Sequence, residues 1–448
     1  MAETYPLLVG HGPESIIAFH KGKPVRVAQF VNEAAQLMAR LPQKRHVLNL
    51  CEDRYHFLLG FAAALQAGQI SLLPPSRAED VLRGLVENYS DSYCLADHDD
   101  VPAGLDVFPV QANADRTSKT LPDPQIAAAQ IAIIVFTSGS TGRPIPHTKN
   151  WASLVKVARA VGERTRLPPG SSILGTIPPQ HLYGMETTVL LPLQCGAVMH
   201  SGRPLLPADI RSALQQIPSP RWLMTTPLHL RACVAEKLKL GGLGGVLSAT
   251  MPLAPDLAQQ VEILWQTRVH DVYGCTEAGI VALRHAASQK NWRTLEGVRI
   301  FGQGKEAWVE GGHIPQPTRL ADHISVVGEQ EFSLHGRLAN MVKIGGKRTS
   351  LDALNAELNR IAGVMDGIFF IPDEAGAVVE RLVAFAVAPG LNAEEIVAEL
   401  RKRIDPVFLP RPLYLVKTLP RNPTGKLPRE NLRKLAAELS PASPFGKT

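Results

Sequence analysis

The chain has 448 residues, a formal net charge of +6, 45% hydrophobic residues and 20% charged residues. This length predicts two or three domains, and the composition is typical of soluble globular proteins, which excludes collagen, coiled-coil and mainly disordered chains. No run reaches the roughly 18 apolar residues of a membrane span, and the first residues lack the basic and apolar regions of a signal peptide. We therefore expect neither a membrane span nor a signal peptide.

The five cysteines are odd in number, widely scattered and without a CxxC pair. This pattern favours neither a disulfide framework nor a zinc site. We expect reduced, mostly buried thiols and a cytoplasmic protein.

Helix-like and strand-like segments alternate through the first 275 residues. A helix over residues 28–38, a strand at 47–50, a helix over 57–67 and a strand at 70–73 come first. Such alternation predicts an α/β fold with a parallel sheet and right-handed crossovers. Further short strands are expected at 131–136, 172–176, 244–247 and 268–272.

Between residues 280 and 334 the pattern changes to short alternating segments, such as 307–310 and 324–327. These segments predict a small subdomain of antiparallel strands. A compact α+β segment follows Arg337, and we place a boundary near 338–340 that separates residues 1–337 from 338–448. We expect the tail, 440–448, to be disordered. The expected elements of the second unit are helices at 351–361, 394–404 and 429–439 and strands at 367–371, 382–387 and 413–417.

The segment from Ile131 to Pro144 runs from an apolar strand into a loop of small hydroxyl residues and glycines. Glycine permits positive φ and close backbone approach, and backbone N–H groups together with hydroxyls form a cradle for phosphate oxygens. The alternative is an ordinary Gly/Ser turn after a strand; the Walker pattern GxxxxGK(S/T) has no match. The loop residues are Thr137, Ser138, Gly139, Ser140, Thr141 and Gly142.

Four ordered motifs give the chain a resemblance to adenylate-forming enzymes, the acyl- and aryl-CoA ligases, luciferases and peptide-synthetase adenylation domains. Residues 136–142 resemble the phosphate loop of that family, and Tyr273–Glu277 resembles its YGxTE motif. Residues 336–348 resemble GRxxxxxKxxGxR, and residues 419–426 resemble an LPxxxxGK close. The resemblance extends from about residue 30 to 435 and is far more specific than one motif.

The resemblance implies that ATP is a substrate whose β- and γ-phosphates are held by residues 137–142. Thr276 would bond the α-phosphate, and Glu277 would bind Mg²⁺, which prefers carboxylate and phosphate oxygens. The alternative for Glu277 is a solvated carboxylate at a helix start.

The same resemblance places adenine against Tyr273 and the loop that contains Ser248, Ala249 and Thr250. Asp322 would bind the ribose hydroxyls with support from Arg337. Asp322 could instead cap a turn, because Leu-Ala precedes it where the family has Thr-Gly. Arg337 could instead form a linker salt bridge.

Lys426 would reach the carboxylate and the α-phosphate and stabilise charge in the adenylation transition state; an exposed surface lysine is the alternative. The resemblance further implies a mobile C-terminal domain that rotates between two half-reactions. This rotation would withdraw Lys426 and bring Lys343, Gly345 and Gly346 to a thiol tunnel.

His181 occupies the position at which the family has a His or an aromatic residue at the mouth of the acyl pocket; a lone structural histidine is the alternative. Relatives that activate amino acids carry an aspartate at the next position, where this chain has Leu182. Burying a substrate ammonium without a carboxylate would be costly, so we expect an aryl or acyl acid. Residues expected to line its pocket, or else to be ordinary core, are Leu182, Met185, Trp222, Val246 and Gly274.

Two positions depart from the family pattern. Ile145 stands where a lysine usually follows the loop proline, and Lys149 or Arg143 could substitute for it. Ala339 stands at the hinge position, where Asp or Lys is common, although a hinge needs no fixed residue type. These departures keep open a second hypothesis, a non-catalytic nucleotide or acyl binder of the same fold, against which Glu277 and Lys426 argue.

The expected activity is conversion of a carboxylic acid and ATP into acyl-AMP and pyrophosphate, followed by transfer to a thiol. The short length and the run at 136–151 resemble ligases of polyene pigment synthesis, which implies a hydroxybenzoate or hydroxycinnamate. The acceptor would be CoA or a carrier-protein phosphopantetheine. From residue 340 onward 16 basic and 12 acidic residues favour an acidic carrier protein, with a solvated basic surface as the alternative. No nucleic-acid recognition motif is present, so no nucleic-acid partner is expected.

Overall fold

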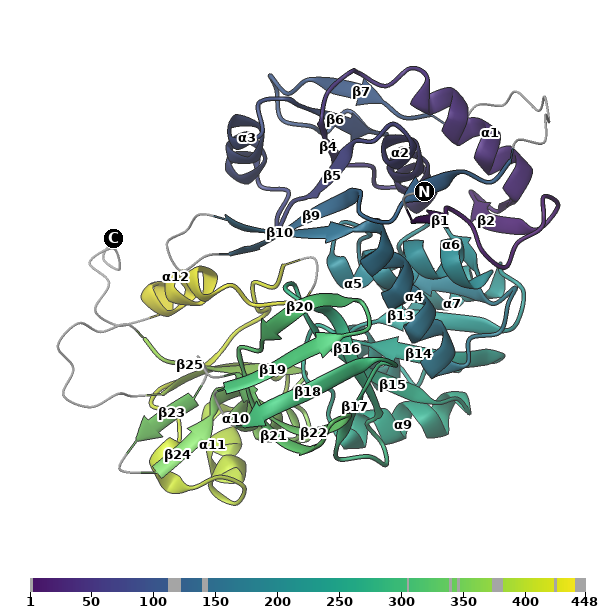
Figure 1. Cartoon of the computed structure of the whole chain (residues 1–448). Coiled ribbons are helices and arrows are strands. Elements are labelled where there is room, and N and C mark those ends of the chain that lie inside the picture. The colour runs from purple at the N-terminus through teal and green to yellow at the C-terminus, as the bar shows by residue number, and fades with distance from the viewer. Residues whose placement is uncertain are drawn as a thin grey trace.

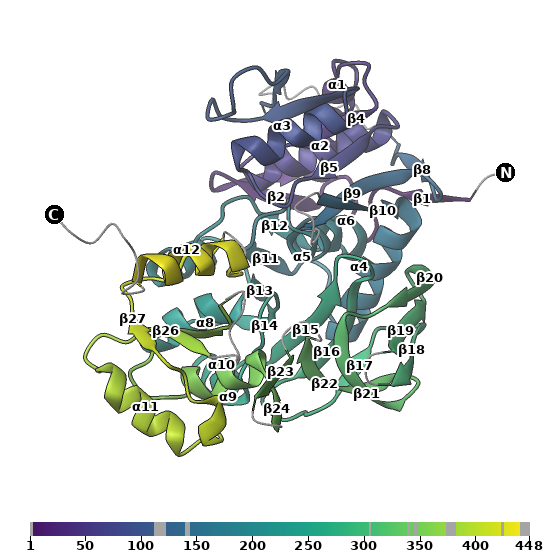
Figure 2. The ribbon, with the colours of Figure 1, turned by 90° about the vertical axis from the view of Figure 1, so that its left-hand side faces the viewer.

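The computed structural model describes residues 3–111, 122–138, 144–303, 306–337, 341–344, 347–372, 382–422 and 425–439. A large N-terminal lobe contains two main sheets, and a smaller α+β unit packs beside it (Figures 1 and 2). The boundary expected at 338–340 and the tail at 440–448 lie outside the described residues.

The largest sheet has eleven strands, and its centre is parallel as the sequence predicted. Strands β2, β12, β11, β13, β14 and β15 run in one direction, so their carboxyl ends share one edge. Antiparallel strands extend the sheet on both sides. In spatial order the strands are β21 (Asp322–Gly328), β22 (Glu331–Arg337), β17 (Trp292–Thr294), β16 (Gly279–His285), β15 (Val269–Cys275), β14 (Leu243–Ser248), β13 (Arg221–Thr225), β11 (Ser172–Gly175), β12 (Val198–His200), β2 (Ile16–His20) and β3 (Lys23–Arg26).

A second sheet of six strands lies in the N-terminal part of the lobe. Its inner strands are parallel, whereas β10 returns antiparallel to β9. In order the strands are β10 (Pro144–Asn150), β9 (Ile131–Ser138), β5 (Ile70–Leu73), β4 (His46–Asn49), β6 (Ser92–Ala96) and β7 (Val107–Pro109), and a separate pair joins β1 (Thr4–Pro6) and β8 (Gln125–Ala127).

Helices fill the space between the two sheets and cover their outer faces (Figure 2). The inner helices contribute to one core cluster that includes residues of both sheets, and separate clusters lie on the outer faces. The inner set is α1 (Val27–Met38), α2 (Arg54–Gln66), α4 (Trp151–Thr165), α5 (Leu182–Met185), the π-helical η1 (Glu186–Leu190) and α6 (Leu191–Cys195); the outer set is α3 (Glu79–Asn88) on the six-stranded sheet and α7 (Pro207–Gln215), α8 (Pro227–Ala235) and α9 (Pro255–Trp265) on the eleven-stranded sheet.

Helix α2 shows why the inner layer has its position. All of its residues from Arg54 to Leu65 are buried, and a helix that is apolar on every side must be covered on every side. It begins at Arg54, three residues before the expected start, because the Asp53 side chain accepts hydrogen bonds from the backbone N–H groups of Tyr55 and His56 at 2.8 and 3.2 Å.

The antiparallel subdomain expected between residues 280 and 334 is also present. Three strands form a small separate sheet, and β21 and β22 join the large one. The small sheet consists of β18 (Val298–Gln303), β19 (Glu306–Gly311) and β20 (Ile314–Arg319).

The C-terminal unit has the expected order of helices and strands. Its two core clusters contain only residues from Val342 onward. The elements are β23 (Met341–Ile344), β24 (Lys347–Ser350), α10 (Leu351–Asn359), β25 (Asp366–Phe370), β26 (Val383–Val387), α11 (Ala393–Arg401), the 3-10 turn η3 (Pro406–Phe408), β27 (Leu413–Leu415) and α12 (Arg429–Leu439).

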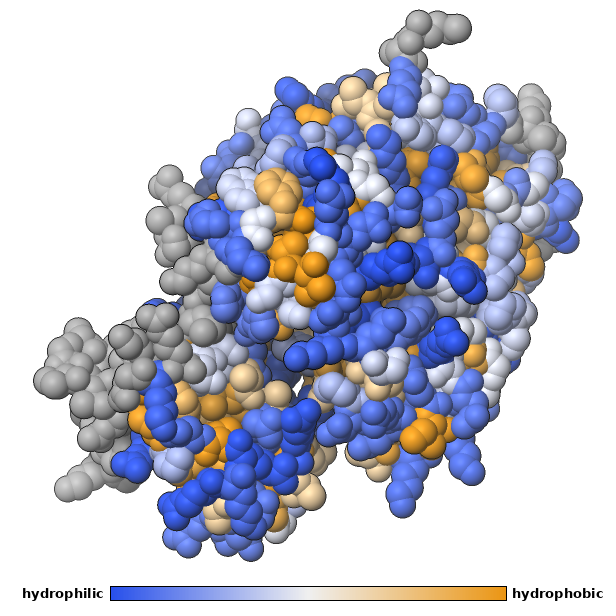
Figure 3. Space-filling model, turned by 60° about the horizontal axis from the view of Figure 1, so that its bottom comes forward, coloured by the Kyte–Doolittle hydropathy of each residue, from blue (hydrophilic) through white to orange (hydrophobic). Residues whose placement is uncertain are grey.

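The surface seen in Figure 3 is mostly hydrophilic, with hydrophobic residues in small separate groups. None of the helices in the described ranges combines the length and the apolar character needed to cross a membrane.

Candidate active site

The carboxyl ends of the parallel strands bring together several residues that the motifs singled out. Strands β13, β14 and β15 end at Thr225, Ser248 and Cys275. Open α/β sheets bind ligands outside this edge. The small domain packs against the same edge, since Arg421 donates a hydrogen bond to the Met251 sulfur at 3.2 Å.

Tyr273 and Asp322 meet although they are 49 positions apart in sequence. The Tyr273 hydroxyl donates a 2.7 Å hydrogen bond to Asp322 Oδ2, and both side chains are buried. The Tyr273 ring packs against Trp292 and Phe332, with centroids 5.6 and 5.4 Å away. Arg337 stands opposite Asp322 in the β21–β22 register. The expected ribose-binding aspartate thus lies beside the expected adenine-binding tyrosine, and the side chain of Arg337 lies outside the described residues.

The loop after β14 has two features of a ligand-binding segment. Ser248 is fully buried, yet its hydroxyl has no hydrogen-bond partner within the described part of the chain. Thr250 adopts φ +78°, which is a strained conformation for a β-branched residue. Strain of this kind concentrates at ligand-binding sites. Ala249, between them, is buried and donates its backbone N–H to the Thr225 carbonyl at 3.3 Å.

The expected phosphate loop connects β9 and β10, but Gly139, Ser140, Thr141 and Gly142 lie outside the described residues, as does the side chain of Ser138. The flanks are described. Thr137 Oγ1 lies 3.1 Å from His147 Nε2, and the same nitrogen lies 4.0 Å from Glu277 Oε1. The His147 ring therefore lies between the flank of the phosphate loop and Glu277, the expected magnesium ligand.

Lys149, on β10, contacts the Thr276–Glu277 turn. Its amine donates to the Glu277 carbonyl oxygen. Burial lowers the pKa of Lys149 and raises that of Glu186, and their mutual attraction opposes both shifts. Glu186 also accepts the Ile280 backbone N–H at 3.2 Å, so this buried carboxyl group is bonded to β16.

His181 is the N-cap residue of α5, one of the inner helices. Burial and the charge of Lys426 lower the pKa of His181 to about 3, so the ring is neutral at pH 7. Its Nδ1 is buried without a hydrogen-bond partner among the described residues. Leu182 and Met185 are buried in the same helix, and Tyr183 donates to the Leu247 carbonyl oxygen at 2.8 Å.

Lys426 follows a tight turn in which Gly425 adopts φ +80°. The Asn422 side chain accepts the Lys426 backbone N–H at 2.9 Å, and the Asn422 N–H donates to the Lys426 carbonyl at 2.8 Å. Arg421 anchors this turn, because its guanidinium binds both carboxylate oxygens of Asp366 at 2.7 Å. The Lys426 side chain is exposed, and its positive charge adds to the effect of burial in lowering the pKa of His181.

Two expected pocket residues lie elsewhere. Trp222 lines a cavity at the amino end of the strands, the opposite end from Ser248. Val246 belongs to the core under α8 and α9, on the other face of the sheet from Leu182. Spacing along the chain could not reveal this, because adjacent strand residues point to opposite faces and the depth along a strand is set by the fold.

The structure describes only part of the segment expected at the thiol tunnel. Gly345 and Gly346 lie outside the described residues, as does the side chain of Lys343. Lys347, in the same segment, forms an exposed ion pair with Asp405 of the small domain.

Sequence reasoning missed His147, Glu186 and Arg421. His147 and Lys149 alternate along one strand, which was the available signal for the first. Arg421 lies within the LPxxxxGK segment but at one of its variable positions. No pattern marked Glu186, since its partners come from β10 and β16.

Comparisons with known proteins agree with this geometry. The family model of AMP-binding enzymes matches residues 26–304, and that of the AMP-binding enzyme C-terminal domain matches residues 367–426. A 4-coumarate–CoA ligase of Rhodobacter capsulatus is 29% identical over 67% of this chain and 76% of its own. A methyl-dioxo-octahydroindenyl propanoyl:CoA ligase of Rhodococcus jostii is 25% identical over 92% of this chain and 83% of its own.

Solved structures show the same fold at low sequence identity. ATP-bound MatB of Rhodopseudomonas palustris has a TM-score of 0.79 at 17% identity, over 95% of this chain and 96% of its own. The o-succinylbenzoate CoA synthetase of Bacillus subtilis, in complex with its acyl-adenylate, has a TM-score of 0.80 at 15% identity, over 96% of this chain and 98% of its own.

Fold and motifs define an adenylate-forming protein. The chain belongs to the AMP-binding enzyme family, and the resemblance found in its sequence is confirmed.

Proposed function

We propose that this protein is an AMP-forming acid–thiol ligase. A carboxylic acid attacks the α-phosphorus of ATP, pyrophosphate leaves, and the acyl group of the resulting acyl-AMP passes to a thiol with release of AMP. Family membership supports ATP-dependent activation of an acid. The observation that carries the proposal is the convergence of Tyr273, Asp322, Ser248 and the turn at Glu277 on one sheet edge that faces Lys426.

The nucleotide is proposed to lie across this edge. Adenine would lie between Tyr273 and the 248–250 loop, with ribose hydroxyls at Asp322. The unpartnered Ser248 hydroxyl fits a polar ligand, because a buried hydroxyl without a partner costs free energy. The triphosphate would extend toward Thr137 and Thr276.

Glu277 is the proposed magnesium ligand. Its carboxylate is 40% exposed, so it is open to the solvent side of the site, while Lys149 holds its backbone. When bound, Mg²⁺ would neutralise phosphate charge. Lys426 would supply the second positive charge, at the developing negative charge of the attacked phosphate.

The acid is proposed to be uncharged apart from its reacting carboxylate. His181 is neutral and Leu182 is apolar, so neither offers a partner to a substrate ammonium. This composition favours an aryl or acyl acid, and similarity to a 4-coumarate–CoA ligase supports a hydroxylated aryl acid.

The acceptor is proposed to be CoA or a carrier-protein phosphopantetheine. Similarity to CoA ligases supports the first. A peptide synthetase, phosphinothricin tripeptide synthetase PhsC of Streptomyces viridochromogenes, is 27% identical over 74% of this chain and 34% of its own, and similarity to it supports the second.

Pyrophosphate exchange across a panel of hydroxybenzoates, hydroxycinnamates, fatty acids and amino acids tests the proposal. We expect exchange with one or more aryl or acyl acids and none with amino acids. Acyl transfer is then measured with CoA and with loaded carrier proteins. Absence of exchange with every acid, although ATP binds, would favour the non-catalytic binder instead.

A further inference from the structure

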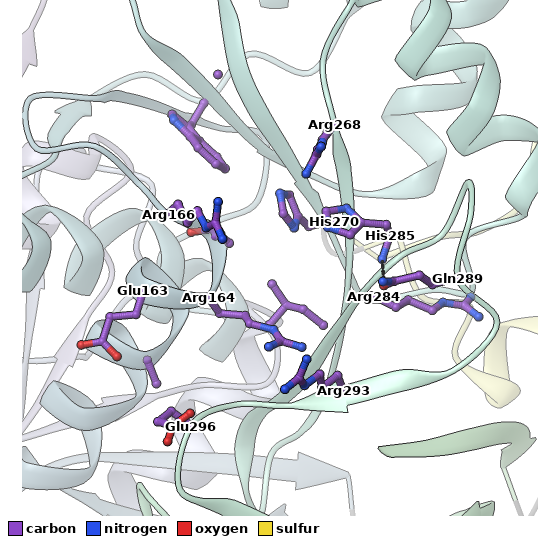
Figure 4. Close-up of a pocket in the computed structure, with 15 residues that line it drawn as sticks. Glu163, Arg164, Arg166, Arg268, His270, Arg284, His285, Gln289, Arg293 and Glu296 are labelled. Atoms are coloured by element: carbon purple, nitrogen blue, oxygen red, sulfur yellow. Dashed lines mark hydrogen bonds between the residues drawn. The ribbon is translucent and has the colours of Figure 1, made fainter. Parts of the chain in front are cut away.

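A cavity of about 530 Å³ lies at the amino end of β14 and β15, between these strands and the end of α4 (Figure 4). It is separate from the proposed nucleotide site, since Gly244 at its wall and Ser248 at that site are four residues apart on β14, about 13 Å along a strand. Its volume suits a small organic ligand.

Five arginines line this cavity, against two glutamates, Glu163 and Glu296. They come from separate parts of the chain: two from the end of α4, one from the start of β15, one from β16 and one from β17 (Figure 4). The arginines are Arg164, Arg166, Arg268, Arg284 and Arg293.

Arg284 is the arginine of this group that has a carboxylate partner. It binds Asp271 Oδ2 at 2.9 Å and lies over the Trp292 ring. Within the described ranges, no hydrogen bond or ion pair joins the other four guanidinium groups to another residue. Burial and then the Arg293 charge lower the pKa of Arg164, while the Glu296 carboxylate opposes this shift, so the two arginine charges are close enough to repel.

Two nitrogens at the cavity wall also have no partner. Trp222 Nε1 and His285 Nδ1 are buried and make no hydrogen bond within the described part of the chain. Burial and nearby positive groups lower the pKa of His270 to about 4, so its ring is neutral at pH 7. The walls therefore combine positive charge, unpartnered polar nitrogens and the stacked rings of Trp222 and His270.

We propose that this cavity binds a small organic molecule that carries two or more phosphate or carboxylate groups. An arginine commonly binds a carboxylate or phosphate through two parallel N–H bonds, so four unpaired arginines from three parts of the chain fit at least two such groups. Binding would relieve the repulsion between Arg164 and Arg293. The site does not depend on the proposed ligase reaction, because it lies at the other end of the sheet.

Calorimetric titration of the full chain tests the proposal, with citrate as the carboxylate probe and inorganic tripolyphosphate as the phosphate probe. We expect at least one to bind, with an affinity that falls as sodium chloride is raised. Stronger binding of citrate indicates a polycarboxylate ligand, and stronger binding of tripolyphosphate indicates a phosphate ester.

The double variant Arg164→Ala/Arg293→Ala should weaken binding about tenfold or more. Arg211→Ala, an exposed arginine of α7, should not change it. Pyrophosphate exchange without added citrate or tripolyphosphate should stay the same in both variants. Tripolyphosphate that occupies the nucleotide site would bind both proteins equally, so the difference reports this cavity. Should the double variant fail to fold, Arg268→Ser, which alters an exposed side chain, replaces it. Equal binding by wild type and variant, or no binding of either anion, would overturn the proposal.

Discussion

At the carboxyl end of the eleven-stranded sheet, several polar groups are held by partners within the protein, whereas at its amino end four guanidinium groups line a cavity without partners among the described residues. Tyr273 holds Asp322, and Lys149 holds the Glu277 turn. The first arrangement is preorganised, so its geometry precedes ligand binding. In the second arrangement, Arg164 and Arg293 repel each other, and an anionic ligand would relieve this repulsion. The two ends of the same sheet thus differ: the proposed nucleotide site has groups held in place by hydrogen bonds, and the proposed anion site has unpaired positive charges.

The largest expected effect at the carboxyl end is that of Lys426→Ala. Loss of this charge should slow pyrophosphate exchange about a hundred- to a thousandfold, because it would stabilise the negative charge of the adenylation transition state. Transfer of the acyl group from supplied acyl-AMP should be largely spared. Lys434→Ala, an exposed lysine of α12 paired with Glu430, is the matched control. If both half-reactions survive in Lys426→Ala, the proposed role is wrong.

Arg421→Met should have the next largest effect. Without its two hydrogen bonds to Asp366, the turn before Lys426 loses its anchor. We therefore expect the adenylation kcat to fall about ten- to a hundredfold, with a smaller change in the KM for ATP. Asp366→Asn should have a similar effect, and the double variant should lose little more. Equal losses in adenylation and in transfer from acyl-AMP would show a general folding defect instead of a positioning role.

Tyr273→Phe should act on nucleotide binding. It removes the hydroxyl that donates to the Asp322 carboxylate, a bond to a charged group that contributes about 1.5–3 kcal/mol. We expect the KM for ATP to rise about tenfold with kcat nearly unchanged. Tyr414→Phe, in the small domain, is the control. An unchanged KM would mean that Asp322 needs no support from Tyr273.

The smallest expected effect is at the amino end, where His270→Gln should change the pH dependence of stability. Burial and the charges of His285, Arg268 and Arg164 lower the pKa of His270 from 6.5 to about 4. Below pH 6.5 the unfolded chain binds a proton that the folded chain does not, so this residue makes stability fall as pH decreases toward 4, by up to about 1.4 kcal/mol per pH unit. Urea unfolding between pH 4.5 and 6.5 should show a shallower dependence in the variant. Identical slopes would contradict the assigned cause.

Much of the fold could be predicted from hydrophobic patterning. The strand expected at 70–73 is β5, and the helix expected at 429–439 is α12. Helix α2 begins earlier than expected because a capping aspartate and a buried arginine do not show in a pattern of apolar residues. The short strands β1, β2 and β3 were not expected, since short strands depend on distant partners for their hydrogen bonds.

The site could be predicted where a motif marks it and not where packing creates it. Tyr273, a motif position, and Asp322, which the resemblance singled out, are joined by a hydrogen bond in the structure, and their nucleotide-binding roles stay proposals. Trp222 lies at the amino end of its strand, away from the proposed acyl pocket at the carboxyl end. The hydrogen bond from Lys149 to the Glu277 carbonyl joins two segments that no motif connects. Lys149, one of two candidates to replace the lysine absent at position 145, contacts this turn in the structure.

The most direct test is a crystal structure of the protein with ATP and Mg²⁺. The account predicts adenine between Tyr273 and residues 248–250, ribose at Asp322 and the metal at Glu277. A nucleotide bound in the arginine-lined cavity alone, or a crevice at the carboxyl end that stays empty at saturating ATP, would contradict it.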